Sequence, residues 1–222
     1  MICPTQISGA EYLDVIINEI AWMGTEGSAN DEWIELYNNS SSSIDLNGWG
    51  IISDDKTPNI FLKNRIPAKG FFILERTNDT TLPKIKSDLI YKGNLSNNGE
   101  HLKLIDNNKK IIDEIDCSKK WFFGDNEVKK TMERKNTLIG GDNSENWQTS
   151  ENSGGTPDRK NSEGQKIKEK VVSSFIEQNN QGSKTFKDKT QNPFFSFLIA
   201  LSVATSSGAF VLFLKKKIEK EY

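Results

Sequence analysis

The chain has 222 residues, with 31 acidic and 29 basic side chains, two cysteines and one histidine. This inventory excludes cysteine-rich zinc sites, and any histidine-dependent triad would have to be built on His101 alone. Residues 1–164 carry 26 acidic and 19 basic side chains, a net charge of −7, whereas residues 165–222 carry 5 and 10. Residues 1–164 therefore form an acidic head, and residues 165–222 form a basic tail. The negative charge of the head disfavours it as a binder of nucleic-acid phosphates.

The N-terminal segment, residues 1–14, has neither a positively charged stretch nor an apolar run, so it is not a complete signal peptide. Two interpretations stay open: the protein is not exported through this end, or the true start lies upstream. Cys3 and Cys117 could pair in an oxidising compartment, but we expect two unpaired thiols.

Residues 15–39 contain two apolar runs that bracket a polar loop at residues 24–30. In the first run Val15, Ile17, Glu19 and Ala21 alternate with Ile16, Asn18, Ile20 and Trp22, and the second run, from Trp33 to Tyr37, alternates in the same way. A period of two with β-branched and aromatic residues predicts two half-buried strands, joined at one end of a sheet.

Short apolar runs separated by turn residues continue to residue 150. They predict strands at residues 44–46, 49–53, 59–63, 71–75, 88–91, 101–106, 110–116 and 131–135. Asn47-Gly48 predicts a hairpin, and Asn107-Asn108-Lys109 predicts a second one in which asparagine takes the left-handed conformation. About nine or ten short strands with frequent turns are typical of an antiparallel β-sandwich.

The aromatic residues and the histidine have both structural and functional interpretations. Four tryptophans could form a ligand platform, but buried anchors are the commoner role in a small sandwich: Trp22, Trp33, Trp49 and Trp147. We predict one sandwich over residues 15–150 with Trp33 or Trp49 in or near its core. His101 is expected to face solvent at a strand start without partners, which makes it a poor catalytic candidate.

A series of motifs in a fixed order carries a family resemblance: NEIAWMG, NDEWIELYNN, LNGW, IPAKGFFILERTNDTT, LSNNGEHLKLID, TMERKN, NWQTS and GGTP. Together they resemble a lamin-tail domain of the prokaryotic type, over residues 15–161. The resemblance implies an immunoglobulin-like β-sandwich without enzymatic activity, found in secreted or surface-attached proteins that bind or organise partners. Asp158 stands where the family's GGTPG ending has its last glycine, so the closing turn departs from the pattern.

Acidic residues within these motifs suggest a metal site. Four carboxylates could supply the oxygen ligands that Ca²⁺ prefers: Glu19, Asp31, Glu32 and Glu35. The competing interpretation is that Glu19 and Glu35 face solvent or accept hydrogen bonds from neighbouring backbone groups. We expect no catalytic residues and no other cofactor, because no nucleophile, base and orienting group can be assembled around His101.

The composition changes after residue 161. Residues 162–192 form a polar linker in which apolar residues at helical spacing make a short amphipathic helix the alternative to a flexible tether. Within residues 193–214, the uncharged run from Phe194 to Leu214 is long enough for one transmembrane helix. The lysine-rich residues 215–222 favour a cytoplasmic C-terminus.

The whole pattern predicts a single-pass membrane protein whose β-domain lies outside the cytoplasm. We expect a non-catalytic surface module that is held in the lipid bilayer and binds a protein or envelope partner. The alternative is an accessory nucleic-acid-binding or nuclease-associated module. The acidic head disfavours this alternative, and a continuous basic stripe on the sandwich would favour it.

Overall fold

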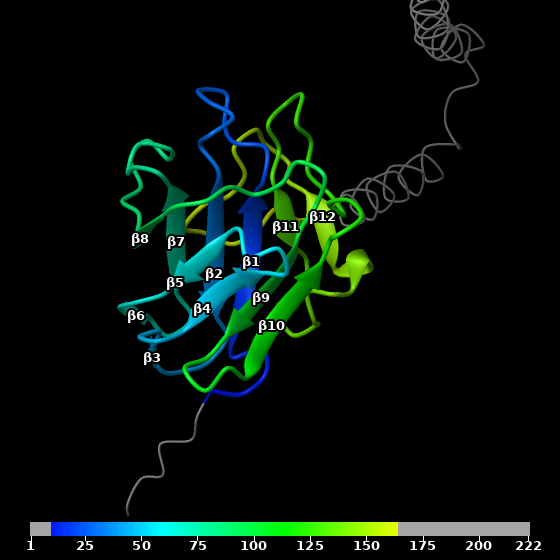
Figure 1. Cartoon of the computed structure of the whole chain (residues 1–222). Helices are drawn as coiled ribbons and strands as arrows, with labels where there is room; N and C mark the ends of the chain where they lie inside the picture. Colours follow the sequence, from blue (N-terminus) through cyan, green and yellow to red (C-terminus); the bar gives the residue numbers. More distant parts are fainter. Residues whose placement is uncertain (1–9, 164–222) are drawn as a thin grey trace, which may run out of the picture. The chain divides into compact units, whose positions relative to one another are not determined.

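The computed structural model describes residues 10–163 (Figure 1). Cys3, nearly all of the predicted linker, the predicted membrane span from Phe194 to Leu214 and the basic tail lie outside the described residues. Among the described residues there is no helix of the length and apolar character that crossing a membrane requires.

The described part of the chain contains twelve β-strands and one short 3₁₀-helix, Ser144–Asn146. The strands are β1 (Val15–Ala21), β2 (Trp33–Asn38), β3 (Ile44–Asp45), β4 (Gly50–Ser53), β5 (Asn59–Phe61), β6 (Arg65–Ile66), β7 (Phe71–Arg76), β8 (Leu89–Tyr91), β9 (His101–Ile105), β10 (Ile111–Asp116), β11 (Met132–Arg134) and β12 (Trp147–Thr149). They form a six-stranded sheet, β12-β11-β1-β2-β7-β8, a four-stranded sheet, β10-β9-β4-β5, and a small β3-β6 ribbon. Figure 1 shows the four-stranded sheet lying across one face of the six-stranded sheet.

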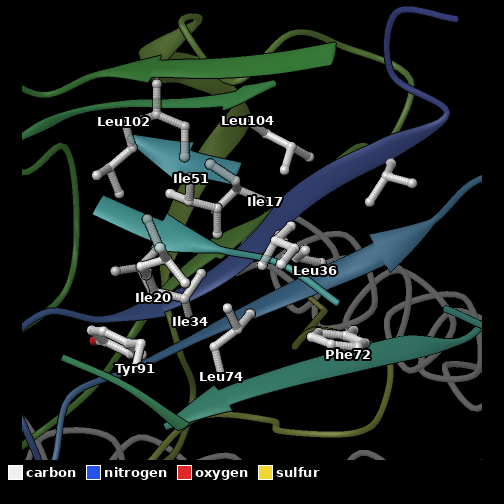
Figure 2. Close-up of a cluster of buried hydrophobic side chains, with 14 of the residues drawn as sticks. Ile17, Ile20, Ile34, Leu36, Ile51, Phe72, Leu74, Tyr91, Leu102 and Leu104 are labelled. Carbon is white, nitrogen blue, oxygen red and sulfur yellow. The ribbon is translucent and has the colours of Figure 1, made fainter. Parts of the chain in front are cut away.

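The main core lies between the two larger sheets. Figure 2 shows Ile17, Ile34 and Phe72 from the six-stranded sheet meeting Ile51 and Leu104 from the four-stranded sheet. Burying apolar area between two sheets is the dominant favourable term for such a layer. The predicted all-β sandwich is therefore confirmed.

The two tryptophans that we expected in or near the core are both buried. Trp49 is 4% exposed and belongs to the main core, whereas Trp33 is 0% exposed and packs with Met23, Ile73 and Leu82 in a second apolar cluster.

The prediction of a wholly antiparallel fold is wrong at one edge, because β7 and β8 are parallel. The polar loop at residues 77–88 returns the chain to the starting end of β7 before β8 begins. A parallel neighbour requires such a crossover, whereas an antiparallel one needs only a tight turn.

A β-bulge in β1 breaks the predicted alternation. The register with β2 shifts between Ile17 and Glu19, so Ile17 and Ile20 both belong to the main core. Strict alternation would place these two residues on opposite faces. After the bulge, Glu19 and Ala21 lie on the outer face of the six-stranded sheet, away from the four-stranded sheet.

The two predicted hairpins have different outcomes. Asn47-Gly48 makes a tight turn, but β3 pairs with β6 and β4 pairs with β5 and β9, so the turn joins two sheets and does not close a hairpin. Residues 107–109 do close the β9–β10 hairpin, yet Lys109 has the positive φ of 69°. The bond from the Lys109 N–H to the Asp106 carbonyl places the left-handed residue at the last position of the turn.

Candidate functional site

A row of buried carboxylates crosses the outer face of the six-stranded sheet. Glu19 on β1 lies opposite Glu35 on β2 and opposite Glu133 on β11, and all three residues are 0% exposed. The bulge in β1 creates this row, because it turns Glu19 to the same face as its two neighbours.

The C-terminal segment of the domain, residues 154–163, covers this row, and we call this segment the strap. The Thr156 N–H donates to Glu19 Oε1 (2.9 Å), the Asp158 N–H donates to Glu35 Oε2 (2.7 Å), and the Ser162 N–H donates to Glu133 Oε2 (3.0 Å). Gly155 makes the close approach feasible, since a Cβ at this position would lie 1.8 Å from Glu19 Oε1.

Burial raises the pKa of two carboxyl groups in this row, Glu19 and Glu35. Desolvation, reinforced by the charge of Glu133, raises the pKa of Glu19 to about 8. Desolvation, reinforced by the charge of Glu19, raises the pKa of Glu35 to about 9. The two carboxyl groups therefore favour the neutral form in the folded domain near pH 7, and they hold the strap by hydrogen bonds.

The structure does not bring the four residues of the predicted Ca²⁺ site together. Glu19 and Glu35 lie side by side beneath the strap, but Glu32 binds Arg76 Nη1 (2.9 Å) and the Leu95 N–H (2.7 Å). The Asp31 carboxylate accepts a bond from the Thr25 hydroxyl (3.1 Å). Between residues 10 and 163, no three His, Cys, Asp or Glu side chains are grouped as metal ligands. The metal site thus stays a prediction that the geometry does not support.

His101 is not the partnerless surface residue that we predicted. Its Nδ1 lies 2.8 Å from Asp54 Oδ2, and its Nε2 lies 3.3 Å from Glu114 Oε2. The bond from Lys103, followed by the bond from His101, lowers the pKa of Asp54. No motif predicted this cluster, because its members come from β9, β10 and the β4–β5 turn.

The other sequence candidates are packing residues. Trp147 is 0% exposed like Trp33, and its Nε1 donates to the Gly141 carbonyl (2.8 Å). Trp22 is half-buried and stacks on Trp121 with ring centroids 6.0 Å apart. Cys117 is free and buried, and burial raises the pKa of its thiol to about 12. These side chains therefore provide neither a ligand platform nor a reactive thiolate.

A surface groove runs beside the strap, from the start of β7 and the end of β2 to β12, the edge strand of the six-stranded sheet. It is lined by basic, aromatic and polar side chains that include Tyr37, Lys69, Phe71, Phe123, Lys130, Lys135, Thr149, Glu151, Lys160 and Glu163. Four lysines thus face two glutamates around the groove. Sequence reasoning missed this site, because its lysines come from four separate segments and none stands in a basic run long enough to signal a patch.

One arginine at the groove contributes no free charge. Arg134 forms a two-point ion pair with Asp113 (2.6 and 2.9 Å) in which both side chains are 0% exposed. The pair joins the two sheets across the core. The groove's positive character therefore comes from its lysines.

A family model described as Lamin Tail Domain matches residues 9–119, half of the chain. No curated protein matches the chain. The matched residues include strands β1 to β10, whereas β11, β12 and the strap follow the match.

Proposed function

The chain belongs to the lamin tail domain family, whose members are immunoglobulin-like and non-enzymatic modules, and on that premise we propose that it binds a partner protein through the groove that reaches β12. The groove itself is the observation that carries this proposal. It offers exposed lysines beside partly exposed aromatic rings, and Tyr37 and Phe71 pack against each other at 5.1 Å. Aromatic side chains are enriched at protein interfaces, and the lysines around them favour a partner of opposite charge.

The titratable groups elsewhere in the head support a non-catalytic role. The buried carboxylates hold the strap or other backbone donors, and His101 lies between two carboxylates. Catalysis needs a nucleophile, a base and an orienting group that converge on a substrate position. The titratable groups of the head instead make hydrogen bonds and ion pairs that stabilise the fold.

The module is held at a membrane by residues 194–214. The supporting observation is the uncharged run from Phe194 to Leu214, directly followed by Lys215, Lys216 and Lys217. At about 1.5 Å per residue this run is long enough for the hydrocarbon core of a bilayer. The β-domain then lies outside the cytoplasm, and the lysines lie inside.

Protease treatment of intact cells tests this membrane arrangement. We expect the head to be shaved off, while an epitope placed after Lys217 survives. Protection of the head would place it in the cytoplasm. Release of the whole chain by salt alone would contradict the membrane span.

Site-specific photo-crosslinking in the same cells tests the binding surface. A photoreactive phenylalanine analogue at the position of Lys135, inside the groove, should give a defined adduct with one membrane or envelope protein. The matched control is the same analogue at the position of Lys63, which is also exposed but does not line the groove. Equal adducts at both positions, or none at either, would contradict a partner that occupies the groove.

The groove lysines also support a second candidate function, an accessory nucleic-acid-binding module. The net charge of −7 over residues 1–164 opposes this candidate, because phosphate binding depends on a broad positive field. We therefore favour the protein partner and use nucleic acid as a competing probe below.

A further inference from the structure

We propose that the groove binds an extended, acidic polypeptide segment, which adds as a new strand to the free edge of β12. This inference rests on the proposed binding function and names the chemistry of the partner. Two independent features carry it: the backbone groups that β12 presents, and the charge around them.

The pairing of β12 with β11 determines which of its backbone groups face the groove. The Lys135 N–H donates to the Asn146 carbonyl (2.7 Å), and the Ser150 N–H donates to the Thr131 carbonyl (3.0 Å). Since antiparallel pairs alternate between bonded and non-bonded, Gln148 bonds to β11, whereas Trp147 and Thr149 direct their backbone groups toward the free edge.

These edge groups can accept another strand. The Trp147 N–H already donates to the Ser144 carbonyl of the 3₁₀-helix. Within residues 10–163, no hydrogen bond uses the N–H or the carbonyl of Thr149. An added strand would therefore find a donor and an acceptor at Thr149 and an acceptor at Trp147, which is the basis of recognition by strand addition.

The charge of the groove selects the occupant. Near β12 the groove contains Lys135 and Lys160, which are exposed, and Lys130, which is half-buried, on a head whose net charge is otherwise negative. The chain's own tail, residues 165–222, is also basic, with 10 basic and 5 acidic side chains. Like charges repel, so the groove favours an acidic partner over this tail.

One edge strand of the four-stranded sheet differs from β12 in charge. The edge strand β10 carries Glu114 and Asp116, so it would repel an acidic strand. Phe123 is 37% exposed in the groove and lies close to β12, because the N–H of the next residue, Gly124, donates to Thr149 Oγ1 (3.0 Å). An extended peptide places alternate side chains on opposite sides, so some can meet the lysines and others Phe123.

Fluorescence anisotropy of labelled peptides tests the proposal with the full-length chain in a non-ionic detergent. The probe is a peptide of alternating glutamate and threonine, about twelve residues long. A peptide of alternating lysine and threonine and a single-stranded DNA of similar length serve as comparison probes. We expect saturable binding of the acidic peptide only, weakened by added salt.

Charge-reversal variants localise the binding. Lys135→Glu combined with Lys160→Glu should weaken binding of the acidic peptide about tenfold, because several exposed charge pairs are reversed. The matched control, Lys63→Glu combined with Lys92→Glu, makes the same change of net charge at exposed positions outside the groove and should leave the affinity within about twofold. Equal weakening in both would assign the binding to net charge and overturn the site.

A backbone-modified peptide tests strand addition separately from charge. N-methylation of alternate amides removes the donors that the edge of β12 requires, and it should abolish binding when the methyl groups face β12. Unchanged affinity for both methylation registers would overturn strand addition. Tighter binding of the DNA than of the acidic peptide would overturn the acidic polypeptide.

These outcomes can be distinguished from a failure of the proposed function. If the acidic peptide does not bind but the photoreactive group at position 135 still gives its defined adduct, the groove binds a partner of different chemistry and only this inference is wrong. If neither experiment gives a signal, both the inference and the proposed function are wrong.

Discussion

Where the strap crosses the six-stranded sheet, both faces of the sheet are buried, but they are buried by opposite chemistry. The inner face presents Ile17, Ile34 and Leu36 to the four-stranded sheet. The outer face presents Glu19 and Glu35, together with Glu133, to the strap. The same strands thus support an apolar interface on one side and a hydrogen-bonded one on the other.

The two faces should therefore lose different amounts of stability when their side chains are substituted. Apolar burial is non-directional and roughly proportional to area, so the inner face loses stability in proportion to the volume removed. The outer face depends on each carboxyl group finding its donors, because a buried polar group without a partner is costly. Small changes of geometry should therefore matter more on the outer face.

The largest loss of stability from a single substitution is expected at the buried ion pair between Asp113 and Arg134. Asp113→Ala leaves Arg134 unpaired between the sheets and removes the acceptor of the Ile17 N–H (2.9 Å). Breaking such a pair costs about 3–5 kcal/mol of unfolding free energy, measurable by urea denaturation. Asp116→Ala, at an exposed position, is the control. Adding Arg134→Met to Asp113→Ala should recover part of the loss, and no recovery would contradict an unpaired charge as its cause.

A substitution that creates a cavity measures how much apolar packing on the inner face contributes to the free energy of unfolding. Leu36 is 0% exposed, and Leu36→Ala should lower the unfolding free energy by about 3 kcal/mol. Leu138→Ala removes the same atoms from a side chain that is 74% exposed and should change it by less than about 0.5 kcal/mol. Similar losses in both variants would mean that Leu36 does not pack as described.

Substitutions at two adjacent glycines test how closely the strap packs on the outer face. Gly154 and Gly155 have nearly equal positive φ angles, 73° and 70°, but a Cβ at Gly154 would meet nothing within 4 Å. Gly154→Ala should therefore cost about 1 kcal/mol for its backbone alone. Gly155→Ala should cost about 2 kcal/mol more, because its Cβ collides with Glu19. Equal thermal shifts would show that the strap does not press on the carboxylate row.

The buried carboxyl groups also predict a dependence of stability on pH. Glu19 and Glu35 have folded-state pKa values of about 8 and about 9, above the ordinary value of 4.5. The folded state therefore binds more protons, so the stability from these groups is full below pH 4.5 and is lost as pH rises through 8 to 9. Each group contributes up to about 1.4 kcal/mol per pH unit in this window, so we expect urea denaturation to show the free energy of unfolding declining by about 2 to 3 kcal/mol per pH unit between pH 6 and pH 8.

Paired amide substitutions check this source of the pH dependence. Glu19→Gln combined with Glu35→Gln should flatten the decline, whereas Glu11→Gln combined with Glu145→Gln, at two exposed positions, should not. A slope that survives in the first variant would assign the pH dependence to other groups.

Much of the fold was predictable, because its signals are local. The alternation from Trp33 to Tyr37 and the run from Phe71 to Glu75 each predicted a strand that the structure contains. The strands that were missed, β6 and β12, are only two and three residues long, so neither shows a period of two. The candidate site was less predictable, since Glu19 and Glu35 were identified as a possible metal pair and not as the anchor of the strap.

The all-β class and the family follow from the sequence, because the period of two, the turn residues and the motif order are properties of neighbouring residues. Three further features come from tertiary contacts: the burial of Glu19, its cover by the strap and the lysine-lined groove that reaches β12. These features depend on contacts such as Thr156 to Glu19, which join residues 137 positions apart. No local pattern encodes such a distance, and the bulge that turns Glu19 toward Thr156 arises only when β1 pairs with β2.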